Sequence, residues 1–112
     1  MIIWEKSHSL VLDIYQATFK FPKAELYALT SQIRRAVFSI PANIAEGCVK
    51  SQQTFINHLS IAQGSLEEVK YYLILSQDLG YLPARSAEVL YERCEEIGKM
   101  TFAFSKKLKA DS

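Results

Sequence analysis

The sequence has few of the residues that break helices or cross-link chains. Its 112 residues include four glycines, three prolines and two cysteines, and Cys48 and Cys94 lie in unrelated contexts. This composition excludes a disulfide framework and a disordered, low-complexity chain. Neither sign of charge dominates, since thirteen Lys and Arg residues stand against twelve Asp and Glu, a net charge of +1. No global field therefore draws the protein to nucleic acid or to membranes, and any anion binding must come from local clustering.

Long apolar runs and targeting signals are missing as well. No stretch approaches the roughly 18 uncharged apolar residues that a membrane-spanning helix needs. The N-terminal Met-Ile-Ile-Trp-Glu-Lys-Ser has no basic region followed by an apolar stretch and a small-residue cleavage site. We therefore expect a cytoplasmic, soluble protein without membrane association.

The patterns that support catalysis or metal binding are not present either. His8 and His58 fall on different predicted helices, and neither has a second histidine or an acid at metal-ligand spacing. The sequence contains no glycine-rich phosphate loop, no Gly-x-Ser-x-Gly and no Cys-His constellation. We expect no catalytic residues, no metal and no cofactor, so the protein is predicted not to be an enzyme.

What the sequence does contain is helical periodicity. Apolar residues recur at helical spacing over four segments, and we predict helices at about residues 3–20, 22–46, 51–79 and 84–109. Pro22 suits a first helical turn, and Gly47 is expected to form a left-handed C-terminal cap on the second helix. Ser51 is expected to cap the third helix, which should end at Gly80.

The apolar positions define the expected core. On the second, third and fourth helices they are Leu26, Leu29, Ile33, Ala36, Ile40 and Ile44, then Phe55, Leu59, Ala62, Leu66, Val69 and Leu73, then Leu90, Cys94, Ile97, Phe104 and Leu108. Short connections make consecutive helices antiparallel. We therefore predict an all-α protein, a single domain over residues 1–112, folded as an up-down-up-down four-helix bundle.

A second set of large apolar residues exceeds what one bundle core accommodates. It consists of Tyr27, Phe38, Tyr72, Leu75, Leu79 and Phe102. Either the first helix covers a broad groove, or part of this surface is buried against another copy of the chain. These six residues are therefore the candidates for an oligomer interface.

A polar ridge runs beside the core face of the second helix, through Gln32, Arg35, Ser39, Asn43 and Glu46. Antiparallel packing about a turn near Val49 places Arg35 opposite Gly64 and within one turn of Glu67 and Glu68, where an arginine–carboxylate pair is geometrically available. One interpretation is a partly buried network that fixes the register of the helices. The other is a contact with a ligand or with RNA.

Several motifs together resemble one known family. They are Trp4-Glu-Lys-Ser-His, Ile14-Tyr15, Phe21-Pro22, Gln32-Ile-Arg-Arg-Ala, Ser39-Ile-Pro-Ala-Asn-Ile-Ala-Glu-Gly47, Phe55, Leu59-Ser-Ile-Ala-Gln-Gly-Ser-Leu-Glu-Glu68 and Leu79-Gly-Tyr81. In this combination the chain resembles, over nearly its whole length, the four-helix-bundle proteins encoded in intervening sequences of bacterial 23S ribosomal RNA genes. The accessory variability protein of diversity-generating retroelements is similar in fold.

The resemblance implies a small cytoplasmic bacterial protein that forms a ring-like homo-oligomer, with a pentamer expected, and that has no known catalysis. It also implies binding to nucleic acid or to a reverse transcriptase. The basic residue that the family usually carries in the loop after Glu-Gly falls here on Lys50.

The residues themselves leave two functions open. Lys50 and Ser51 lie at a predicted helix N-terminus, where free backbone N–H groups and the helix dipole favour an anion. The other candidate RNA contacts are Arg34, Lys106, Lys107 and Lys109. One hypothesis is a homo-oligomeric scaffold or adaptor that binds RNA or an RNA-handling protein. The alternative is a protein-only interaction module, in which these lysines merely solvate helix ends.

Overall fold

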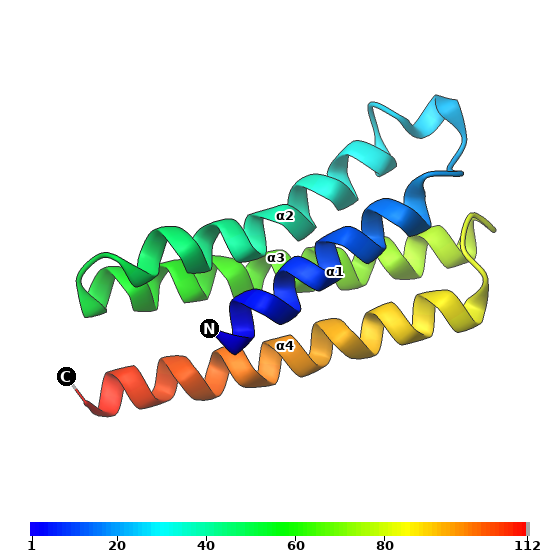
Figure 1. Cartoon of the computed structure of the whole chain (residues 1–112). Coiled ribbons are helices and arrows are strands. Elements are labelled where there is room, and N and C mark those ends of the chain that lie inside the picture. Colours follow the sequence, from blue (N-terminus) through cyan, green and yellow to red (C-terminus); the bar gives the residue numbers. More distant parts are fainter. Residues whose placement is uncertain (112) are drawn as a thin grey trace.

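The computed structural model describes residues 1–111 and consists of four long helices with one short helical turn (Figure 1). They are α1 (Ile2–Thr18), the 3₁₀ turn η1 (Lys23–Glu25), α2 (Leu29–Cys48), α3 (Gln52–Asp78) and α4 (Ala84–Ala110). The prediction of an all-α fold is confirmed, and residues 1–111 contain no strand. Ser112, the last residue of the expected domain, lies outside the described part.

The helices form a closed, antiparallel ring of neighbours. Each helix packs on the next one in the chain, and α1 also packs on α4. The two diagonal pairs, α1 with α3 and α2 with α4, do not pack against each other. The contact between α1 and α2 therefore lies on the opposite side of the bundle from the contact between α3 and α4, and the ribbon shows the same arrangement of the four helices (Figure 1).

The core follows the predicted apolar positions on α3 and on most of α4. All six expected positions of α3 are buried, and so are Leu90, Cys94 and Ile97 of α4, whereas Phe104 and Leu108 are half-buried. The buried apolar residues other than Ile56 belong to one continuous cluster. Because apolar residues at steps of three and four return to the same side of a helix, this pattern alone specifies which side faces inward.

The ends of α3 match the sequence signals. The side chain of Ser51 accepts a hydrogen bond from the backbone N–H of Thr54, 3.3 Å away, which makes it an N-cap. At the other end Gly80 has a φ of +80°, a left-handed conformation that glycine adopts without steric cost. The prediction that α3 ends there is confirmed.

The expected start of the second helix is wrong. Pro22 precedes the single turn of η1, and α2 begins only at Leu29 after a break at Ala28. Tyr81, in the α3–α4 turn, donates a hydrogen bond to the carboxylate of Glu25 (2.8 Å), which also accepts the backbone N–H of Leu29 (3.4 Å). This contact fixes η1 as a separate turn, and Leu26, expected in the core, is instead 46% exposed.

Gly47 does not form a left-handed cap, contrary to expectation. It lies inside α2, which continues to Cys48, and Gly80 alone among the glycines has a positive φ. A Cβ atom added to Gly47 would lie 2.7 Å from Cβ of His58 on α3. The glycine is therefore required by the close approach of α2 and α3, and not by backbone conformation.

Polar contacts close the ring between α1 and α4. Arg93 of α4 forms an ion pair with Asp13 and a hydrogen bond to Ser9 (3.2 Å), and Lys6 pairs with Glu96 at 3.4 Å. These pairs are largely exposed, so they contribute more to register than to stability.

None of the helices in residues 1–111 is both long enough and apolar enough to cross a membrane.

Candidate functional site

The middle of the polar ridge forms a network that joins α2 to α3. Asn43 donates a hydrogen bond through its amide nitrogen to the carbonyl of Ser39 (2.8 Å), so its side-chain oxygen is left to face Nδ1 of His58 at 2.9 Å. Nδ1 must therefore carry the proton. The hydroxyl groups of Ser39 and Ser65 lie 2.5 Å apart. These four half-buried or buried side chains fix the register of the two helices.

The ends of the ridge do not join this network. Gln32, Arg35 and Glu46 are exposed, and Arg35 makes no hydrogen bond or ion pair within residues 1–111. The expected pair of Arg35 with Glu67 or Glu68 is absent from this part of the chain. Glu67 pairs with Lys70 instead, at 3.2 Å. The short side chains of Ser39 and Asn43 bridge the two helices, whereas Arg35 is exposed to solvent.

Arg34, a candidate RNA contact from the sequence, is held by contacts within the chain. Its Nε donates to the hydroxyl of Thr18 at 3.0 Å, and its guanidinium lies 4.6 Å from the centre of the Tyr15 ring. A terminal nitrogen also donates to the carbonyl of Tyr15, 3.4 Å away. Arg34 is therefore held at the C-terminal end of α1, where a positive charge is favoured by the helix dipole.

The remaining candidate cations gather at one end of the bundle, far from Arg34. The side chain of Gln52 donates a hydrogen bond to the carbonyl of Leu108, which places the start of α3 beside the end of α4. Lys50, Lys106, Lys107 and Lys109 are all exposed there, and we call these four residues the lysine end. Lys50 pairs with Glu46 at 3.4 Å, but both side chains are about half exposed, so the pair is weak.

Ser51 is less available than the sequence suggested. Its hydroxyl donates to the hydroxyl of Thr54 (2.9 Å) and accepts the backbone N–H of the same residue. The donor that was expected to meet an RNA phosphate is therefore already used inside the chain. Any anion at this helix start must rely on Lys50 and on free backbone N–H groups.

The six candidate interface residues divide into two groups. Tyr72 and Leu75 are half-buried and pack against the core, so the bundle itself absorbs them. Tyr27, Phe38, Leu79 and Phe102 stay exposed, with exposed fractions of 92%, 46%, 47% and 61%. The first helix therefore does not cover all the surplus apolar surface, and four of the six residues remain available for a partner.

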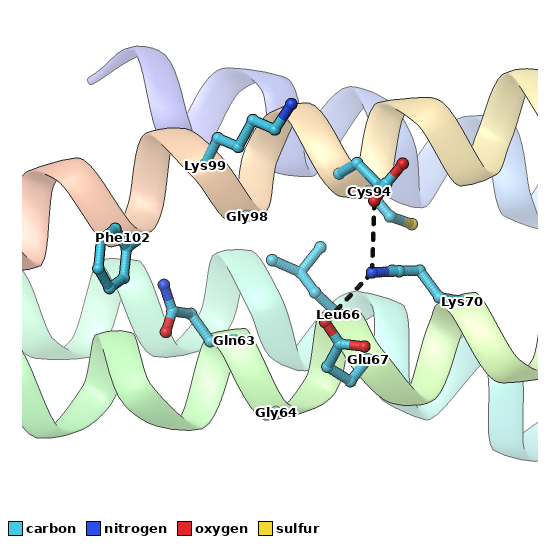
Figure 2. Close-up of a pocket in the computed structure, with 10 residues that line it drawn as sticks. Gln63, Gly64, Leu66, Glu67, Lys70, Cys94, Gly98, Lys99 and Phe102 are labelled. Atoms are coloured by element: carbon cyan, nitrogen blue, oxygen red, sulfur yellow. Dashed lines mark hydrogen bonds and ion pairs between the residues drawn. The ribbon is translucent and has the colours of Figure 1, made fainter.

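One of these residues, Phe102, lines a groove between α3 and α4 (Figure 2). The groove has a volume of about 450 Å³, and Gly64 and Gly98 also line it. Lys70 of α3 reaches across it to Glu95 of α4 at 3.8 Å. It also pairs with Glu67 of its own helix at 3.2 Å (Figure 2). Burial lowers the pKa of Lys70, but the hydrogen bond and the attraction of these carboxylates outweigh it, and the net result is a raised pKa. The lysine is therefore a charged bridge.

The groove continues along the same two helices toward the α3–α4 turn. This second part has a volume of about 420 Å³, and we call it the acidic groove, since Glu88, Glu92 and Glu95 are its charged lining residues. Its other lining residues are Leu73, Ile74, Gln77, Ala84, Ala87 and Tyr91. The small alanine side chains leave room for a larger group from outside.

The opposite side of the bundle carries a groove of different character. It lies between α1 and α2, has a volume of about 300 Å³, and is lined by Tyr15, Leu26, Tyr27, Thr30, Ser31, Arg34, Arg35 and Phe38. We call it the basic groove, because both of its charged lining residues are arginines. The hydroxyl of Thr30 is buried and has no hydrogen-bond partner within residues 1–111.

The comparisons with known proteins support one family. The model of the 23S rRNA-intervening sequence protein family matches residues 1–103. The chain belongs to this family. A solved structure from Bacteroides thetaiotaomicron, described as a protein with unknown function from the S23 ribosomal protein family, is 28% identical, with a TM-score of 0.85 over 94% of this chain and 96% of that one. The comparison with curated proteins gave no match.

The thiols of this intervening-sequence protein differ in environment. Cys48 is exposed at the end of α2, whereas Cys94 is buried and burial raises its pKa to about 12. The thiol of Cys94 is therefore protonated at neutral pH and is a poor nucleophile.

Within residues 1–111 no group of three or more His, Cys, Asp or Glu side chains is placed to hold a metal ion.

Sequence reasoning missed two members of the α2–α3 network, His58 and Ser65. A signal was present, because the turn at Val49–Ser51 brings Asn43 opposite His58 and Ser39 opposite Ser65. Polar residues that face each other across an otherwise apolar contact indicate a buried hydrogen bond. The role of Tyr81 in holding Glu25 carried no comparable signal.

Proposed function

We propose that this intervening-sequence protein is a cytoplasmic, non-enzymatic homo-oligomeric scaffold that binds RNA at its lysine end. The observation that carries the proposal is the exposure of Tyr27, Phe38 and Phe102 on a bundle whose core is already complete. Association that buries large exposed aromatic side chains is stabilised by a free energy of about 25 cal/mol for each Å² of apolar surface removed from water. A pentameric ring, which the family resemblance implies, is the assembly we expect.

The lysine end supports the RNA part of the proposal. Lys50, Lys106 and Lys107 are exposed near the start of α3, where free backbone N–H groups and the helix dipole add to the positive potential. One such cluster is a weak site on a chain with a net charge of +1. An oligomer repeats the cluster once per copy, and avidity turns several weak contacts into a useful affinity.

The protonation states of Cys94 and Lys70, which line the groove between α3 and α4, favour a binding role over a catalytic one. The raised pKa of Cys94 keeps its thiol protonated. The raised pKa of Lys70, held by Glu67 and Glu95, keeps its amine charged. Neither residue is an activated nucleophile, because activation requires the opposite shifts.

RNA binding is tested by fluorescence anisotropy with labelled single-stranded and stem-loop RNA at several salt concentrations. We expect the logarithm of affinity to fall linearly with the logarithm of salt concentration, and Lys50→Glu or Lys106→Glu/Lys107→Glu to reduce both the affinity and the slope. Lys20→Glu/Lys23→Glu, the same charge change at exposed positions at the other end of the bundle, is the control. Arg35→Ala should leave the slope unchanged in samples whose oligomer is intact by light scattering.

Two results would contradict RNA binding at this end. Equal losses of affinity in the control pair and in the lysine-end pair would show that only the net charge matters. Absence of binding at low salt, with the oligomer intact, would favour the protein-only interaction module. The oligomer is checked in every sample by light scattering.

A further inference from the structure

We propose that the basic groove of one copy binds the acidic groove of the next copy, so that self-association is head-to-tail. The inference rests on the proposed homo-oligomer and names the two surfaces that build it. The occupant of each groove is therefore a second copy of this chain.

The placement of the two grooves allows a continuous assembly. They lie on opposite sides of the bundle, since one is formed by α1 and α2 and the other by α3 and α4. They also lie at the same end, because the hydrogen bond of Tyr81 to Glu25 joins the two turns beside which they open (Figure 1). Successive copies that use both grooves therefore stay side by side at one level, and a small rotation per copy closes a ring.

The charges of the two grooves are complementary. Arg34 and Arg35 are the charged residues that line the basic groove, and Glu88, Glu92 and Glu95 are those that line the acidic groove. Within the chain Glu88 pairs with Arg85 at 3.7 Å and Glu95 with Lys70 at 3.8 Å, and Arg34 is held by Thr18, so one charge on each side is left for a partner. Arg35 and Glu92 are both exposed, and neither makes an ion pair or a hydrogen bond within residues 1–111. Two basic grooves or two acidic grooves would repel each other, so the charges select the head-to-tail arrangement over a symmetric dimer.

The apolar surfaces also match. Tyr27 is 92% exposed and Phe38 is 46% exposed at the edge of the basic groove. The acidic groove offers the exposed side chain of Ile74 and the half-buried ring of Tyr91 beside Ala84 and Ala87. A projecting aromatic ring that enters a pocket floored by small residues is the usual anchor of a protein interface.

The unpartnered hydroxyl of Thr30 is an independent indication on the basic side. Thr30 is 4% exposed and lines the basic groove, yet its hydroxyl has no hydrogen-bond partner in the described residues. Buried polar atoms without a partner are rare in isolated folded chains. The hydroxyl is closed to solvent in the single copy, so a second copy supplies its missing partner only if the side chains that cover Thr30 move when the copy seats in the groove.

The test uses one variant for each groove. Tyr27→Ser/Phe38→Ser removes the anchors of the basic groove, and Glu88→Lys/Glu92→Lys makes the acidic groove repel Arg35 of a neighbour. All four residues are exposed, so we expect both variants to fold. Each alone should run as a monomer of 12.7 kDa in size-exclusion chromatography with light scattering, where the wild-type chain runs as an oligomer.

Mixing the two variants decides between head-to-tail and other arrangements. Each variant keeps one intact groove, so a 1:1 mixture should give a heterodimer of about 25 kDa, twice 12.7 kDa, and nothing larger. Its formation also shows that both variants are folded. Glu46→Lys/Val49→Ser, at exposed positions at the far end of the bundle, is the control that should assemble like the wild type.

Three outcomes are distinguishable. If either groove variant keeps the wild-type mass, or if the mixture leaves two monomers, the head-to-tail inference is overturned while the homo-oligomer stands. If the wild-type chain is itself monomeric, the proposed function fails first. Should a groove variant lose its helical circular dichroism, Arg35→Glu and Glu92→Arg replace the pair. Each alone should run as a monomer, and their 1:1 mixture, in which an arginine faces a glutamate at both kinds of contact, should form assemblies larger than the heterodimer.

Discussion

Substitution of Gly47 by alanine tests the close approach of α2 and α3. The added Cβ would lie 2.7 Å from Cβ of His58 and 3.0 Å from Cδ1 of Phe55. The Cβ of His58 is attached directly to the backbone of α3, so no side-chain rotation relieves the contact and the helices must move apart. Overpacking of this kind costs up to about 3 kcal/mol. Alanine recovers about 1 kcal/mol through its higher helix propensity, which leaves a net loss of roughly 2 kcal/mol.

The assay is thermal and urea unfolding followed by circular dichroism, at one fixed protein concentration because association adds to apparent stability. A loss of about 2 kcal/mol lowers the melting temperature by roughly 8 °C for a chain of this size. Gly64→Ala is the matched control, since no atom lies within 4 Å of its added Cβ and α3 should gain about 1 kcal/mol. The reasoning is refuted if Gly47→Ala is as stable as Gly64→Ala.

Three further predictions concern polar groups. Arg34→Met should lower stability by about 1–2 kcal/mol in urea unfolding, because it removes the hydrogen bond at the end of α1 and the contact with the Tyr15 ring; an unchanged midpoint would contradict this. Asn43→Ala and His58→Ala should each cost about 1–3 kcal/mol and combine to less than their sum, whereas strict additivity would show that the pair is not coupled. Burial holds the pKa of Cys94 near 12, above its ordinary value of 9.0, so the folded chain keeps a proton that the unfolded chain loses. Stability should therefore fall between pH 9 and pH 12 by up to about 1.4 kcal/mol per unit, a slope that Cys94→Ala should reduce if the reasoning holds.

The sequence predicted α3 and α4 well because their signals are local. Ser51 and Gly80 act on the backbone within a few residues of their own positions. Apolar residues spaced by three and four positions all fall on one side of a helix, so they determine which side faces the core. The start of α2 was not predictable in this way. Pro22 is compatible with an α-helix and with a 3₁₀ turn, and the choice depends on Tyr81, which is 56 residues from Glu25 in the chain.

The candidate surfaces were predictable as sets of residues and not as contacts. The ridge prediction included Ser39 and Asn43, which do bridge the helices, but also Arg35, which projects into solvent. A glycine such as Gly47 carries no mark in the sequence that separates a need for positive φ from a need for close packing. The opposition of a basic and an acidic groove emerges only when four helices are arranged in space, because each groove combines residues from two helices.

The central claim is that the protein works as a homo-oligomer. The most direct measurement is the mass of the unmodified chain in solution, by size-exclusion chromatography with light scattering over a tenfold dilution in the micromolar range. We predict a multiple of 12.7 kDa, and for the expected pentamer a mass of five times that value, about 64 kDa. A mass of 12.7 kDa throughout the dilution series would contradict the account.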